Sequence, residues 1–177
     1  MEPRYSGTAP EPKLMLLDFI EARRQAVLGK VGAMPYEAMT ASVLPSGWTP
    51  LGMLTHLVFM ERRWLVWGFK AEAVREPQGD RGADHRFQVP KGWGYLELSA
   101  LYAAQSERTR AIVEAAHLSD RAALGGWFAT SEEAPTLGWI LIHVLGEYVQ
   151  HAGHLDVVAE LLSDSDGRWR RGSPTGP

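Results

Sequence analysis

Apolar residues recur at helical spacing in four separate segments of the chain. The first segment runs from about Lys13 to Val31, and its apolar positions are Leu14, Leu17, Ile20, Ala26 and Val27. Gly32 follows at the place where a helix would end. This pattern predicts a first helix.

The second segment has a clear start signal. Thr49 is an N-cap residue followed by proline at the first helical position, so we expect a helix from about Pro50 to Phe69. The side chains predicted to form its core face are Met53, Leu57, Met60, Trp64 and Trp67.

Two more helices are predicted, from about Tyr95 to Ala116 and from about Thr136 to Leu162. Residues 72–94 carry several Gly and Pro without periodicity and are predicted to be a long loop, either a lid or binding loop or a disordered segment. Strand-length alternation is absent from the sequence, so the pattern favours an all-α four-helix bundle.

Chain length and end composition predict a single domain. The 177 residues, 45% of them apolar, suit one globular unit with a sizeable core. We expect residues 13–163 to form the bundle. Residues 1–12 and 164–177 are predicted to be a flexible arm and a flexible tail because they are rich in Pro, Gly and Ser.

Charge and cysteine content exclude several classes of function. A net charge of -3 with scattered Lys and Arg argues against nucleic acid as a partner. The sequence has no charge-free apolar run of about 18 residues and no secretory signal pattern, so we expect a cytoplasmic protein that does not cross a membrane. The absence of cysteine excludes disulfides, a cysteine zinc site and a cysteine nucleophile.

The last predicted helix carries a polar stripe. His143, Glu147, His151 and His154 follow one another at steps of four, four and three, which places them within about 80° on the helix. Apolar residues flank the stripe on both sides and leave little solvent face besides Gln150 and Glu160, so this helix is predicted to be buried around most of its circumference. Buried imidazole and carboxylate groups need compensation, for instance by a metal ion.

Metal binding would need a further ligand from another helix. His56 lies among apolar residues on the second predicted helix and is the candidate; alone, it would be read as a core histidine with an ordinary hydrogen bond. His85 and His117 lack such a setting and are predicted to be surface residues. On the last helix the spacing leaves three ligand pairs open, His143 with Glu147, Glu147 with His151, and His151 with His154.

The segments LTHLVFMERRW and HVLGEYVQHAGHLDVVAELL resemble the DinB-like superfamily, which includes YfiT-like metal hydrolases and thiol transferases and the mycothiol-dependent maleylpyruvate isomerases. The resemblance covers about Leu14 to Leu162 and implies a metal-binding four-helix bundle. It implies His56, Glu147 and His151 as the metal ligands. A Glu and His pair resembles the mycothiol-dependent branch, and it leaves His143 and His154 as candidates beside the ligands.

The resemblance implies a metal-dependent thiol S-transferase that joins mycothiol or a related small thiol to an electrophile. Zinc suits the ligand set first, with nickel, manganese and iron also compatible. Arg63 and Trp67 are candidates for binding the substrate, and a structural salt bridge is the alternative for Arg63.

Two other functions remain open at this point. One is hydrolysis by a metal-bound water, with His143 or His154 as proton shuttle. The other is a metal-binding module without catalysis. A homodimer is a further hypothesis, because seven tryptophans in a short chain favour an exposed apolar patch and relatives of this kind often pair.

Overall fold

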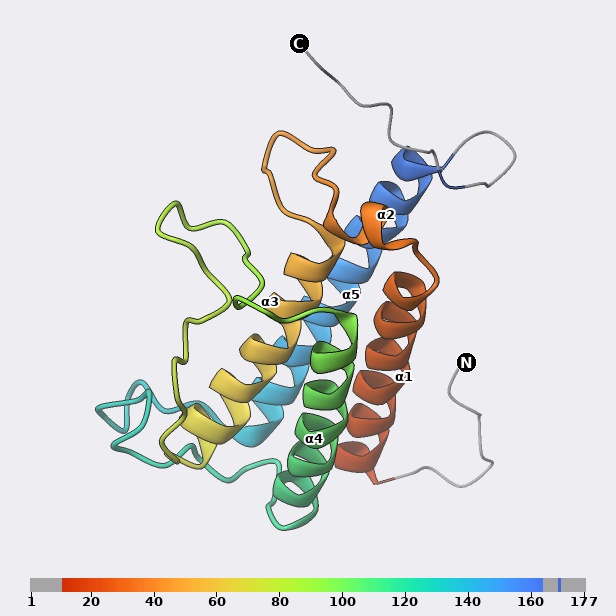
Figure 1. The fold of residues 1–177 in the computed structure, drawn as a ribbon. Helices are drawn as coiled ribbons and strands as arrows, with labels where there is room; N and C mark the ends of the chain where they lie inside the picture. The colour runs from red at the N-terminus through yellow and green to blue at the C-terminus, as the bar shows by residue number, and fades with distance from the viewer. Residues whose placement is uncertain (1–10, 164–168, 170–177) are drawn as a thin grey trace.

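The computed structural model describes residues 11–163 and Trp169, and its main feature is a bundle of four long helices (Figure 1). The four are α1 (Pro12–Gly32), α3 (Pro50–Arg62), α4 (Tyr95–Glu114) and α5 (Leu137–Leu162). The described part of the chain contains isolated β-bridges but no strands. The prediction of an all-α four-helix bundle is confirmed.

Threonine side chains cap the two helices that matter most for the site. The Thr49 hydroxyl accepts a hydrogen bond of 3.0 Å from the Gly52 amide, which fixes the start of α3 as the sequence predicts. Thr136 caps α5 in the same way through the amide of Trp139, at 3.3 Å. Both helices therefore begin at defined residues.

Two local elements were not predicted. A short helix, α2 (Tyr36–Thr40), follows α1, and α3 continues directly into a π-helix, η1 (Arg63–Phe69). In η1 the Lys70 amide bonds to the carbonyl of Leu65, five residues earlier, at 3.2 Å. Such wide turns are often found at functional sites.

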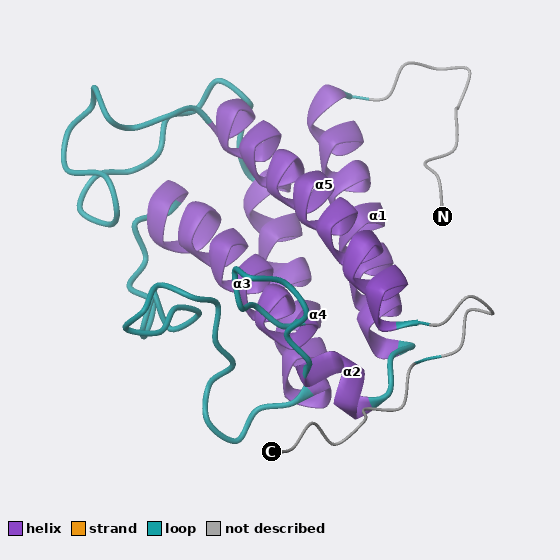
Figure 2. Cartoon of the chain, turned by 90° about the horizontal axis from the view of Figure 1, so that it is seen from above, coloured by secondary structure: helices purple, strands orange, loops and turns teal. Residues whose placement is uncertain are grey.

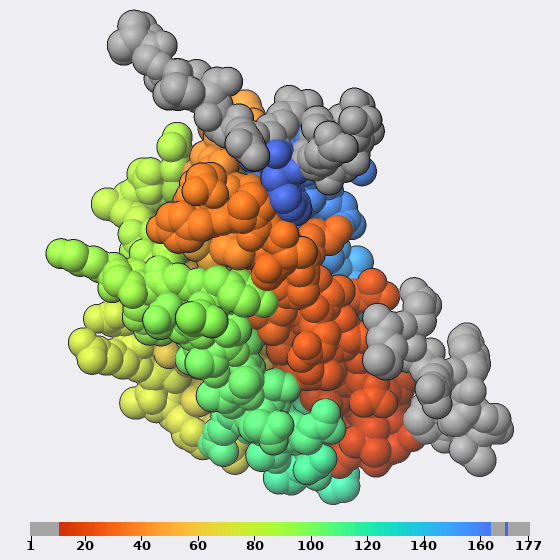
Figure 3. All heavy atoms as spheres, turned by 45° about the vertical axis from the view of Figure 1, so that its right-hand side comes forward, coloured from red at the N-terminus to blue at the C-terminus, as the bar shows by residue number. Residues whose placement is uncertain are grey.

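Helix α3 is covered on all sides. All of its residues from Pro50 to Glu61 are buried, because α1, α2, α4 and α5 pack around it and the loop after η1 covers the remaining side (Figure 2). In the space-filling view α1, in red and orange, and α4, in green, meet along one face of the molecule (Figure 3).

Helix α5 is less buried than the sequence predicts. Ile142, Val149 and Val157 are 64%, 53% and 53% exposed, so the expectation of burial around most of the helix is wrong. The physical reason is that α5 packs mainly against α1 and α3, which cover only one side of it. The apolar residues on its other side face solvent.

A buried polar network links the four long helices. Glu61 on α3 forms a salt bridge of 2.6 Å with Arg24 on α1 and accepts hydrogen bonds from Thr109 on α4 and Tyr148 on α5. Burial raises the pKa of the Tyr148 hydroxyl, which therefore stays a donor. Because Tyr148 follows Glu147 directly, the network also sets the register of α5 against α3.

The flanking segments are only partly described. The predicted arm over residues 1–12 and the predicted tail over residues 164–177 lie outside the described residues except for Glu11, Pro12 and Trp169. Trp169 forms a β-bridge with Ser163. Among the described helices, none combines the length and apolar character needed to span a membrane.

Candidate metal centre

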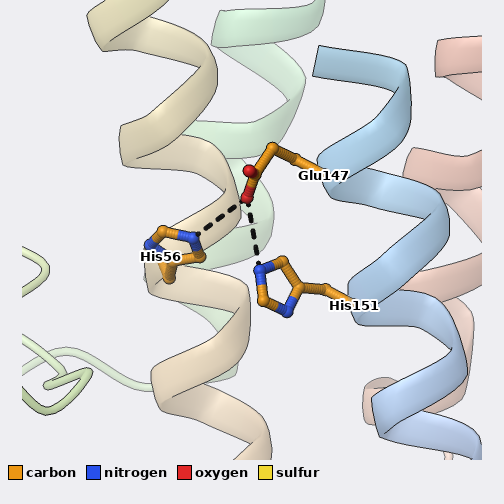
Figure 4. Close-up of side chains that lie close together, drawn as sticks. All are labelled: His56, Glu147 and His151. Carbon is orange, nitrogen blue, oxygen red and sulfur yellow. Dashed lines mark ion pairs between the residues drawn. The ribbon is translucent and has the colours of Figure 1, made fainter. Parts of the chain in front are cut away.

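His56 on α3 and the pair Glu147 and His151 on α5 converge at one point (Figure 4). Oε2 of Glu147 lies 3.6 Å from Nε2 of His56 and 3.3 Å from Nε2 of His151. One donor atom from each of the three residues lies within 4.8 Å of the other two. Residues some ninety positions apart in sequence are thus brought to a single site by the packing of α3 against α5.

The three residues fit a divalent metal ion. Two ligand atoms that each lie about 2.1 Å from a tetrahedral ion are separated by about 3.4 Å, close to the spacings observed here. Two imidazoles and one carboxylate leave coordination positions open, as in catalytic rather than structural sites. The donor set therefore suits an ion that also binds a substrate.

Electrostatics keep the Glu147 side chain ionised. The adjacent imidazoles of His151 and His56 hold the pKa of this carboxyl well below its usual range, although partial burial opposes the shift. His56 and His151 are both buried, whereas Glu147 is partly open to the neighbouring cavity. The site thus offers a charged oxygen beside two nitrogen donors.

Asp80, from the loop after η1, fixes the orientation of His56. Its Oδ2 lies 2.9 Å from Nδ1 of His56, and its side chain is fully buried. Burial raises the pKa of Asp80, but hydrogen bonds from His56 and Arg63 outweigh it and give a net lowering. Because an ionised carboxylate only accepts hydrogen bonds, Nδ1 of His56 carries the proton, and the lone pair of Nε2 faces Glu147.

A hairpin-like turn of the same loop completes the support of His56. The amide of Gln88 bonds to the carbonyl of Asp80 at 2.9 Å, and Arg81 forms a β-bridge with Phe87. The Phe87 ring stacks on the His56 ring at 3.9 Å with an interplanar angle of 9°. One edge and one face of the imidazole are therefore held by a single turn.

The other two histidines of the stripe lie beside the trio. Nδ1 of His154 is 3.3 Å from Nδ1 of His151, so His154 contacts the ring nitrogen that points away from Glu147. Nε2 of His143 is 3.8 Å from Oε1 of Glu147, and its ring stacks on Trp139. His143 is half-buried and His154 is exposed, whereas His151 is buried.

Arg63 and Trp67 have different surroundings. The Arg63 guanidinium bonds to both oxygens of Asp80, at 2.5 and 3.2 Å, and to the carbonyl of Pro77 at 2.8 Å. This is the structural salt bridge considered as the alternative for Arg63. Trp67 stacks on Trp127, with ring centroids 5.7 Å apart. His85 and His117 are exposed, as expected.

The trio opens into a cavity of about 390 Å³. Its lining combines the metal-site side chains with polar and aromatic groups, including Arg63, Trp64, Arg81, Trp127 and His143. A cavity of this size holds a small molecule. The arrangement can therefore bind a cation and present it to a small organic ligand.

Comparison with known families agrees with this geometry. The family model described as mycothiol-S-transferase (MST) matches residues 15–164, which include all of α2 to α5 and most of α1. The chain belongs to the mycothiol-S-transferase family. No curated protein matches the sequence at a significant level. Membership of the MST family confirms the resemblance seen in the sequence and implies mycothiol as cosubstrate.

Asp80 is the residue of this MST-family site that the sequence did not reveal. It lies in an irregular loop, 24 positions after His56, where no helical period relates the two residues. The only signal was the unusual length of the loop over residues 72–94, which indicated a binding loop without indicating its contact with His56.

Proposed function

We propose that the protein is a metal-dependent enzyme that conjugates mycothiol, through its thiol sulfur, to an electrophilic small molecule. The observation that carries the proposal is the convergence of His56, Glu147 and His151 beside a cavity in a chain of the MST family. Because the chain contains no cysteine, the nucleophilic sulfur has to come from a cosubstrate.

Zinc is the proposed metal, since two histidines and a glutamate suit it well; nickel, manganese and iron are compatible with the same donors. Nε2 of His56, the Glu147 carboxylate and Nε2 of His151 would hold the ion. A divalent cation at this position stabilises a thiolate and so makes a thiol nucleophilic near neutral pH.

The proposed reaction forms a bond between sulfur and carbon. The thiol loses its proton, the sulfur electron pair forms a bond to an electrophilic carbon, and the leaving group departs with the pair from the bond that breaks. His143 is the proposed acceptor of the thiol proton because it lines the cavity beside Glu147. His154 is proposed to hold the His151 ring through their shared contact.

Arg63 and Trp67 are proposed to act on the substrate indirectly. Arg63 holds Asp80 and thereby His56, while it also lines the cavity. Trp67 supports Trp127, another residue of the cavity lining. We place the reaction in the cytoplasm, where small thiols are kept reduced.

We further propose that two copies of the chain pair through α5. Its exposed side carries Ile142, Val149 and Val157, with Gly146 and Gly153 between them, and a Cβ on either glycine would meet nothing within 4 Å. The glycines leave grooves into which the apolar side chains of a second α5 fit around a two-fold axis. Light scattering should give a dimer mass for the wild type and a monomer mass for Val149→Glu.

Metal analysis and a thiol assay test the function. The zinc-loaded wild type should conjugate mycothiol to monobromobimane faster than the uncatalysed reaction, and His151→Ala should lose both bound zinc and turnover. His117→Ala, at an exposed histidine, is the matched control. Turnover of ester or amide substrates without any thiol, in the absence of conjugation, would refute the proposal in favour of hydrolysis.

A further inference from the structure

A second hollow, of about 430 Å³, lies next to the metal cavity. It is formed by the segment before α5 and the first turn of that helix, with Arg121, Phe128, Glu132, Glu133 and Trp139 among its lining residues. Trp64 lines both hollows, so they share one wall. A ligand that reaches around Trp64 can occupy both.

The aromatic rings of Trp64, Phe128 and Trp139 form an apolar part of the wall of this second hollow. The Trp64 ring lies 5.4 Å from that of Trp139 and 4.6 Å from that of Trp127, and Trp139 is 52% exposed. The loop before α5 approaches η1 closely enough for the Trp127 amide to bond to the Trp67 carbonyl, which holds Trp127 and Phe128 beside Trp64. The Trp139 indole stacks on His143 with one face, and its 52% exposure leaves further ring surface for a ligand.

The polar groups at the rim favour a neutral ligand rich in hydroxyl groups. Arg121 donates to the carbonyls of Ser131 and Ala134, at 3.0 and 2.9 Å, so its cation is engaged in holding the loop. Backbone and side-chain hydrogen bonds lower the pKa of Glu132, which stays an anionic acceptor. With Glu133 beside it, the rim repels anions and accepts hydrogen bonds from hydroxyls.

We propose that this second hollow binds the sugar and inositol portion of mycothiol while its thiol lies at His56, Glu147 and His151. The inference rests on the function proposed above. Mycothiol carries its thiol on a cysteine joined to an uncharged, hydroxyl-rich pair of rings. Such rings have apolar faces for stacking on Trp139 and hydroxyl edges for Glu132 and Glu133. The metal cavity then remains available for the electrophile.

Substitution of Trp139 tests the subsite in the full-length, zinc-loaded enzyme. Trp139→Ala should raise the KM for mycothiol about 3- to 10-fold, the effect of losing one aromatic contact. Because Trp139 also stacks on His143, any change in kcat should be the same for every thiol. The ratio of kcat/KM for mycothiol to that for N-acetylcysteine, which has no sugar, should fall by the same factor. Trp139→Phe should restore most of the ratio. Trp93→Ala removes a partly exposed tryptophan that contacts Phe59 instead, and it should leave the ratio unchanged.

The outcomes separate the two proposals. If Trp139→Ala leaves the ratio unchanged, or raises only the KM for the electrophile, the subsite is refuted while thiol transfer stands. If the wild type turns over no thiol, the function fails, and tryptophan fluorescence titration with N-acetylglucosaminyl-inositol, whose amine is acylated and uncharged as in mycothiol, then tests the hollow alone. Quenching that saturates in wild type and Trp139→Phe but not in Trp139→Ala supports the subsite, and its absence in wild type refutes it.

Discussion

Replacement of Asp80 by asparagine tests the support of His56 most directly. The Asp80 carboxylate accepts three charge-assisted hydrogen bonds, one from His56 at 2.9 Å and two from Arg63 at 2.5 and 3.2 Å. Oδ2 accepts from both His56 and Arg63, so an asparagine oxygen in that position keeps two of the bonds, and its NH₂ group then faces the Arg63 Nη1 donor. One bond is lost, the other two lose their charged acceptor, and the Arg63 cation stays buried without its counterion.

The expected cost follows from these contacts. Removing one charge of a buried ion pair while its partner stays buried gives a destabilisation of about 3–5 kcal/mol. Total stabilities of about 5–15 kcal/mol leave the variant folded. Because a neutral amide holds the His56 ring more weakly than the carboxylate does, we expect zinc affinity to fall about 10- to 100-fold.

Urea unfolding of the metal-free protein measures the destabilisation. Competition with a chromophoric chelator measures the zinc affinity, under conditions where circular dichroism shows that the variant is folded. Asp84→Asn is the matched control, because Asp84 is an exposed aspartate of the same loop. If Asp80→Asn matches this control in zinc affinity, Asp80 does not position His56.

Three more outcomes are expected. Glu61→Gln should destabilise the fold by about 3–5 kcal/mol in urea, because the buried Arg24 cation loses its salt bridge, whereas exposed Glu160→Gln should change little. Burial raises the pKa of the Tyr148 hydroxyl above 10.0, so the stability it contributes is complete below about pH 10 and declines as the pH rises further; Tyr148→Phe should flatten this decline, and an unchanged alkaline slope would contradict it. Thr49→Ala should cost about 1 kcal/mol of unfolding free energy by removing the cap of α3, and an effect near zero would show that Pro50 alone fixes the helix start.

The sequence predicted the long helices well because their apolar periods and caps are local signals. Thr49 and Pro50 fixed the start of one helix to the residue, and the stripe on α5 contained Glu147 and His151, although only the family resemblance selected this pair among three. The wide turn of η1 was not predictable, since an i to i+5 hydrogen bond leaves no distinct pattern of residue types.

Contacts that depend on packing could not be predicted from the sequence. The exposure of Ile142 and Val149 follows from the number of helices that cover α5, which a single helix pattern does not contain. Glu61 precedes Arg62 and Arg63 in the sequence, and nothing there indicated that it is fully buried against Arg24 from another helix. In both cases burial is decided by neighbours from distant segments.

The location of Asp80 on a loop also bears on how an ion bound at this centre would leave it. The helices that carry His56, Glu147 and His151 are tied together by the Glu61 network, so we expect them to separate only when the bundle opens. The turn around Asp80 and Phe87 can detach alone, since local openings of loops cost far less than global unfolding. Ion release would then follow the opening rate of this turn and become independent of chelator concentration once the chelator is in excess.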